Sequence, residues 1–254
     1  MENLIKYEFR KSWMVKAIIL TITAIFEVMF LTGVVAGNDN VAFSGALFLV
    51  FTTICSIFII GVLSVFVLHK DLNTKQSYML FMTPNSTYKI LGAKIIENFG
   101  SIILAGVMFF VLAVVDISIW SAKSEGVKGT IDFVGDIIGL ATKDGIQLDI
   151  LHIAITTADS LVSWVFVVMV GFFAVVLSAC FFNGRKFNGL LSFVIFLVVT
   201  IVINKIFDTS SVMIFGANAM YAIEARICSI VYYLVLTTVL YIVTAGIMDR
   251  KLSV

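Results

Sequence analysis

The chain has 254 residues, of which 61% are hydrophobic and 13% are charged, and its formal net charge is +1. Soluble domains carry about 25% charged and about 45–50% apolar residues, so this composition excludes an ordinary soluble domain. The excess of apolar residues predicts an all-α integral membrane protein. A net charge this close to zero gives no reason to expect a nucleic acid partner.

Six apolar segments reach the roughly 20 residues that a helix needs to cross the hydrocarbon core of a bilayer. They cover residues 16–36, 42–68, 95–120, 161–182, 190–207 and 227–248. A short amphipathic helix is expected ahead of them, over residues 1–15, because apolar and basic side chains separate there onto different faces. Such a helix lies in the membrane interface and leads into the first span.

The positive charges favour one side of the membrane. Twelve of the 17 Lys and Arg residues lie before or at the first residue of the first segment, between the second and third, between the fourth and fifth, or after the sixth. Because cytoplasmic connections are enriched in Lys and Arg, both termini are predicted to be cytoplasmic. The same topology places the polar segment 69–94 in the cytoplasm and makes 121–160 an extracellular loop with some local structure of its own. The whole chain is expected to form a single transmembrane domain.

The polar segment holds the only proline of the chain, Pro84. Apolar residues recur at roughly helical spacing over 71–82, and Asp71 and Asn73 are expected to cap the start of this short helix. Proline disfavours helix at the residue before it, so the helix ends there, and Asn85 and Ser86 are expected to cap the next one. This pattern predicts a docking element for a soluble partner, and an ordinary solvated loop is the alternative.

The polar segment contains, in order, Asp71, Thr74, Met79-Leu80, Pro84, Ser86, Ile90-Leu91 and Lys94. In this order of residues it resembles the first cytoplasmic loop of ABC-2-type transporter permeases. The amphipathic start of the chain is similar to the elbow helix of these permeases, and the basic turn at Arg185 and Lys186 is similar to one in short permeases of Gram-positive bacteria. The family often has Glu and a Gly-Thr pair where this chain has Asp71 and Asn73-Thr74.

The resemblance implies a permease subunit of an exporter in a bacterial plasma membrane. Such a permease pairs with a second copy of itself or a related permease, and its first cytoplasmic loop rests on a separate ATPase subunit that holds ATP and Mg. This chain has no P-loop motif, so we expect it to bind no cofactor and not to be an enzyme itself. The residues expected to contact the ATPase are Asp71, Thr74, Lys75, Tyr78, Met79, Leu80 and Pro84, with Arg185 and Lys186 as a second contact.

Three carboxyl groups lie within the predicted spans, where a charged side chain is costly and often functional. Glu27 is near the middle of the first span, and Glu97 and Asp116 are in the third. We expect them to line a substrate pathway, and polar contacts between helices, such as Asp116 with Lys205, are the alternative. The sequence shows no metal-ligand pattern and predicts no metal site.

The expected cargo is a hydrophobic or amphipathic peptide, as in exporters of the phenol-soluble modulin type, which short permeases of this kind resemble. Two other functions stay open. One is an ion-coupled secondary transporter, which would favour helices interrupted by Gly or Pro. The other is a membrane scaffold or sensor subunit that binds a partner without transport.

Overall fold

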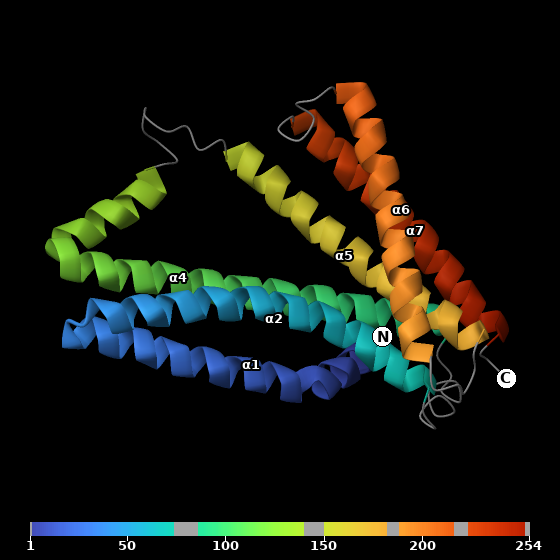
Figure 1. Ribbon diagram of the computed structural model, residues 1–254, viewed down its shortest axis with the longest axis horizontal. Coiled ribbons are helices and arrows are strands. Elements are labelled where there is room, and N and C mark those ends of the chain that lie inside the picture. Colours follow the sequence, from blue (N-terminus) through green and yellow to red (C-terminus); the bar gives the residue numbers. More distant parts are fainter. Residues whose placement is uncertain (1, 74–85, 140–149, 182–187, 216–222, 252–254) are drawn as a thin grey trace. The chain divides into compact units, whose positions relative to one another are not determined.

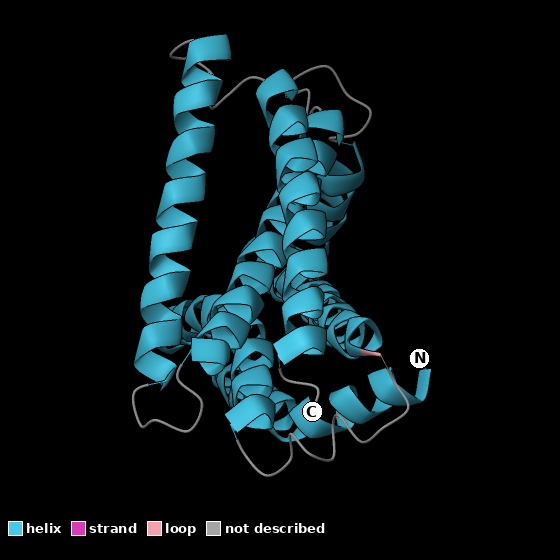
Figure 2. Ribbon diagram, turned by 90° about the vertical axis from the view of Figure 1, so that its right-hand side faces the viewer, coloured by secondary structure: helices cyan, strands magenta, loops and turns pink. Residues whose placement is uncertain are grey.

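The computed structural model describes residues 2–73, 86–139, 150–181, 188–215 and 223–251. Within these ranges every residue is helical except residues 37, 38 and 86 (Figures 1 and 2). The helices are α1 (Glu2–Ala36), α2 (Asp39–Asn73), α4 (Thr87–Gly139), α5 (Ile150–Phe181), α6 (Asn188–Phe215) and α7 (Ile223–Lys251).

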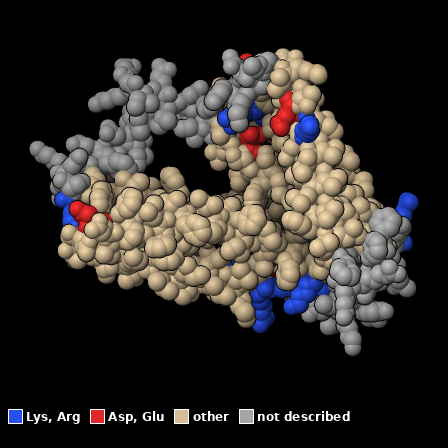
Figure 3. Space-filling view, viewed as in Figure 1, with Lys and Arg blue, Asp and Glu red and all other residues tan. Residues whose placement is uncertain are grey.

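Each of these helices contains a stretch long and apolar enough to cross a membrane. This confirms the prediction of a helical, multi-pass membrane protein with six candidate spans. On the face that Figure 3 shows, the long middle part of α1 and α2 carries no charged side chain, as a surface in contact with lipid requires. Which membrane the chain occupies, and on which side its termini lie, stay predictions.

The helices extend further than the apolar segments alone indicate. The expected elbow over 1–15 is continuous with the first span in α1, and its position against a membrane stays a prediction. The predicted loop 121–160 is largely helical, because α4 continues to Gly139 and α5 begins at Ile150. The ribbon of α4 also changes direction sharply towards its C-terminal end (Figure 1). The local structure expected in this loop is therefore the continuation of two spans.

The chain divides into two compact units. The first unit comprises Met1–Glu8, Gly61–Phe99 and Leu151–Val254, and the second comprises Phe9–Ile60 and Gly100–Ile150.

The first unit packs around one face of α5. The fully buried Met169, Phe172 and Val176 lie on α5, and they contact residues from the end of α2, the start of α4 and the end of α7. Leu68 and Leu91 are the residues that α2 and α4 bury completely here. The core therefore contains the end of α2 and the start of α4, which border the predicted docking element.

The second unit contains a tight hairpin of α1 and α2. Gly37 adopts a left-handed conformation with φ of 70°, which costs glycine nothing, and the N–H of Asn38 donates to the carbonyl of Gly33 at 3.1 Å. The side chain of Asn38 then accepts a hydrogen bond from the N–H of Val41 at 3.4 Å and caps α2. The turn that the sequence predicts between the first two spans is thus two residues long.

A buried ion triad and a carboxyl pair as candidate functional sites

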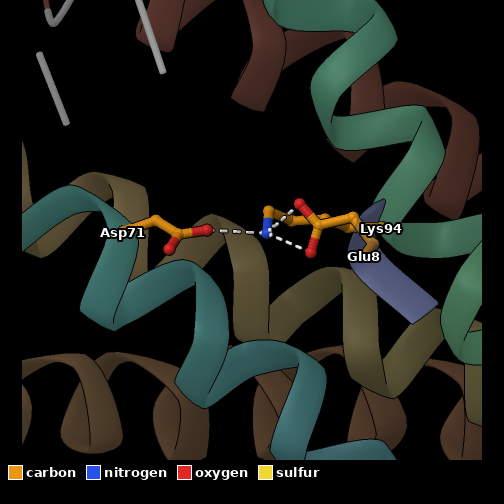
Figure 4. A network of polar contacts seen from close by, with 3 residues as sticks. All are labelled: Glu8, Asp71 and Lys94. Carbon is orange, nitrogen blue, oxygen red and sulfur yellow. Dashed lines mark hydrogen bonds and ion pairs between the residues drawn. The ribbon is translucent and has the colours of Figure 1, made fainter. Parts of the chain in front are cut away.

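The side chain of Lys94 lies between two carboxylates in the first unit (Figure 4). Its Nζ is 2.9 Å from each carboxylate oxygen of Glu8 and 2.8 Å from Oδ2 of Asp71. All three side chains are buried, and that of Lys94 is only 1% exposed. We call these three residues the ion triad.

The helices bring the ion triad together because each charged residue sits among core residues of its own helix. Lys94 follows Leu91 by three residues and Ile90 by four, so it lies on the face of α4 that these two bury. Asp71 follows the fully buried Leu68 by three residues on α2. Glu8 comes from α1, which makes the triad a link among three helices.

Buried charges such as these are stable only when the oppositely charged partners are present together. Moving one ion out of water costs several kcal/mol, and the attraction between partners offsets this when the geometry is good. Hydrogen bonds to charged groups contribute about 1.5–3 kcal/mol each, and Lys94 makes three contacts of this kind. The ion triad therefore specifies how the three helix segments meet.

The triad also bears on the predicted docking element. Asp71 lies in the last turn of α2, so the prediction that it caps the start of a separate helix is wrong. Asn73 is the last residue of α2. The side chain of Asp71 is buried against Lys94, and its contact with a soluble partner stays a prediction. The other residues expected to contact a partner lie outside the described residues: Thr74, Lys75, Tyr78, Met79, Leu80, Pro84, Arg185 and Lys186.

The start of α4 is held by further contacts within the first unit. The carbonyl of Ser86 accepts hydrogen bonds from the N–H groups of Lys89 and Ile90, at 2.9 and 3.2 Å, so Ser86 occupies the capping position that the sequence predicts. The hydroxyl of Tyr241, on α7, donates to the carbonyl of Tyr88 at 2.7 Å. The helix that leaves the predicted docking element is thus fastened at its first turn.

A second polar site lies in the second unit. The carboxyl groups of Glu27, on α1, and Asp116, on α4, are neighbours that interact electrostatically. Each group also keeps one buried oxygen without a hydrogen-bond partner, Oε2 of Glu27 and Oδ1 of Asp116. The sequence singled out both residues for a substrate pathway, and the structure brings them together as a carboxyl pair. The partner of Asp116 suggested by the sequence was Lys205.

The carboxyl pair adjoins a pocket of about 340 Å³ between α2 and α4. Asp116 is one of its lining residues, and most of the others are apolar or aromatic. Glu97, the third carboxyl that the sequence assigned to a pathway, is buried in the first unit and does not line this pocket. The structure therefore groups two of the three expected pathway residues.

Sequence reasoning missed the role of Glu8, which lies within residues 1–15, where only a short interfacial helix was expected. The structure buries Glu8 with 6% exposure and pairs it with Lys94. One signal was present: Lys94 lies next to apolar residues in the run ILGAKII, and a lysine in such a run needs a partner.

In the described part of the chain no three His, Cys, Asp or Glu residues gather in a way that could hold a metal ion.

Comparison of the chain with protein-family models, with curated proteins and with solved structures finds no match.

Proposed function

We propose that this chain is the membrane-spanning permease subunit of an ATP-driven exporter of the ABC-2 type. Six candidate spans support a membrane transporter, and the resemblance of the polar segment 69–94 supports this class. In the proposal the ATPase is a separate chain that binds ATP and Mg, and a second permease completes the complex. The cargo is a hydrophobic or amphipathic peptide.

The observation that carries the proposal is the ion triad. A coupling element transmits force only if the helices on both of its sides are firmly attached to it. Asp71 lies on α2 just before the expected coupling residues, and Lys94 lies on α4 just after them. Their ion pair, joined by Glu8, links the two helices where the segment leaves and re-enters the bundle. A push on the segment would then move α2 and α4 together.

The first experiment tests the partner. The chain is co-purified with the product of its neighbouring gene, and the expected partner carries a P-loop. Replacing Tyr78, Met79 and Leu80 together by Ala is expected to weaken the complex roughly tenfold or more, as loss of an apolar anchor at an interface does. Lys89→Ala is the matched control, because Lys89 is exposed on the first turns of α4 and is not assigned to the contact. An unchanged complex with the triple variant would refute the coupling role.

The carboxyl pair favours a second candidate, an ion-coupled transporter. Paired acidic side chains within spans serve as proton relays in such proteins, and Glu27 and Asp116 are neighbours inside candidate spans. Transport in proteoliposomes separates the two functions. The ABC proposal expects transport only with the ATPase and ATP present, whereas the alternative expects transport by the chain alone under a proton gradient.

A further inference from the structure

The pocket in the second unit is lined mainly by apolar side chains and is polar on one side. Its aromatic walls come from three helices: Phe30 on α1, Phe43 on α2, and Phe109 and Trp120 on α4. A volume of about 340 Å³ lies at the lower end of the range for small-molecule sites, roughly 300–1,000 Å³. This space is far larger than a single metal ion needs, so its shape favours an organic group.

Few polar groups face this pocket. Apart from the indole of Trp120, its polar lining residues are Thr53 and Asp116. The hydroxyl of Thr53 donates to the carbonyl of Leu49 at 2.9 Å, so it is already used within its own helix. The carboxyl of Asp116 has a buried oxygen with no partner, and the adjoining Glu27 has another. Asp116 is therefore the one carboxyl among the lining residues, and Glu27 lies beside it.

The charge of this pair points to one kind of ligand. Carboxyl oxygens accept hydrogen bonds and carry negative charge when ionised, so Asp116 and its neighbour Glu27 favour a cationic donor. Lys123, two helical turns after Asp116 on α4, donates its ammonium to the carbonyl of Val34 and is not a partner of the pair. An ammonium group has three donors and a positive charge, and it suits these oxygens.

We propose that the Glu27–Asp116 pocket binds an amphipathic cation, with the ammonium group at the carboxyl pair and the apolar body between α2 and α4. The apolar walls exclude inorganic cations, which keep their hydration shells, and the carboxyl pair selects against anions. The proposed binding site depends only on residues of the second unit. That the bound cation is also the cargo rests on the proposed function, and the cargo is then cationic and amphipathic.

The test uses three compounds that share one apolar body and differ in the charge of the head: 4-phenylbutylamine, 4-phenylbutanol and 4-phenylbutyrate. Trp120 lines the pocket and reports binding through its fluorescence once Trp13 and Trp164 are replaced by Phe. The full chain is measured in nanodiscs of phosphatidylcholine and phosphatidylglycerol, without an ATPase. We expect saturable binding of the amine, weaker binding of the alcohol by roughly tenfold or more, and no binding of the acid.

Variants of the two carboxyl residues test whether the carboxyl pair causes the preference for the amine. Asp116→Asn and Glu27→Gln are expected to reduce the preference for the amine over the alcohol to about onefold, because the charge that selects the amine is removed. Asp39→Asn is the matched control, since Asp39 is exposed in the same unit and does not line the pocket. Ala113→Phe fills the pocket from an exposed position on α4 and is expected to abolish binding of every compound.

Two results would overturn the proposal: equal affinities for the amine and the alcohol, or an amine preference that survives both carboxyl variants. Loss of amine binding when phosphatidylethanolamine replaces part of the phosphatidylcholine would support the ammonium site, assign it to a resident lipid amine, and overturn its extension to cargo. Because no ATPase is present, amine binding without a co-purifying ATPase would support this site while refuting the proposed function.

Discussion

At the scale of single residues, Lys94 and Asp116 show two ways to keep a polar group within an apolar protein. Lys94 is enclosed by two carboxylates and has its charge compensated within the first unit. Asp116 lies beside another carboxyl group, lines a pocket, and has one oxygen without a hydrogen-bond partner. The ion triad suits a structural role, because its charged groups bind one another. The carboxyl pair suits ligand binding, because one of its acceptor oxygens has no hydrogen-bond partner.

Removing the central cation of the ion triad is expected to destabilise the chain most. Lys94→Met leaves two buried carboxylates close together with no cation between them, and the expected loss of unfolding free energy is about 3–5 kcal/mol. Glu8→Gln leaves the pair of Lys94 and Asp71 intact, so its expected cost is smaller, about 1–3 kcal/mol. Denaturation of the purified chain in mild detergent measures both.

Lys89→Met is the control for this series, because it makes the same change at an exposed position on the same helix. Its expected effect is within about 0.5 kcal/mol. A Lys94→Met variant as stable as Lys89→Met would show that the ion triad does not hold the three helices.

At the scale of elements, the apolar runs predict the six helices because a span needs an unbroken stretch of apolar residues. The helix ends are harder to predict, because they depend on contacts made after folding. The first turns of α4 precede the third apolar run, and there Tyr88 is bound by Tyr241 of α7. The ion triad and the carboxyl pair could not be predicted either. Each joins helices whose adjacency no local pattern reveals, although the sequence named three of the five residues as candidates.

The hairpin of α1 and α2 offers a test at this scale. A Cβ atom added at Gly45 would lie 2.7 Å from the backbone nitrogen of Phe30, closer than real Cβ contacts. Gly45→Ala is therefore expected to push the two helices apart and to cost about 1–3 kcal/mol. Phe30 also lines the pocket, so the same change is expected to weaken ligand binding there. Thermal unfolding and Trp120 fluorescence are the two measurements.

Gly106→Ala is the matched control for Gly45→Ala. Gly106 lies in α4 of the same unit, and a Cβ atom there would have no neighbour within 4 Å. Alanine favours helix over glycine by about 1 kcal/mol, so this variant is expected to be as stable as the original chain or more stable. Equal losses at both positions would refute close packing at Gly45 as the cause.

At the scale of the whole molecule, the distribution of Lys and Arg predicts the orientation that the proposed function requires. The coupling segment works only if it faces the compartment that contains ATP. Six crossings of the membrane would place both termini and the segment 69–94 on the same side, and the turn after α1 on the other side. Orientation is therefore a direct test of whether an ATPase can reach the segment.

Cysteine labelling measures this orientation. In a chain whose three native cysteines are replaced by Ser, Asn40→Cys is expected to react with a membrane-impermeant maleimide in intact cells. Lys89→Cys is expected to react only after the cells are opened. Both side chains are exposed in the structure, so reactivity reports the side of the membrane rather than burial. The opposite pattern would place the coupling segment outside and refute an ATP-driven role.

The ion triad has a consequence for the order in which the chain assembles during synthesis. Glu8 and Asp71 emerge from the ribosome before Lys94 does, so at first the two carboxylates have no cation from this triad to share. The hairpin of α1 and α2 needs only residues near in sequence and is complete early, since Phe30 meets Gly45. The N-terminal segment and the end of α2 can lock into place only when the start of α4 has followed. The first unit therefore cannot finish assembling until α4, which carries Lys94, has been synthesised.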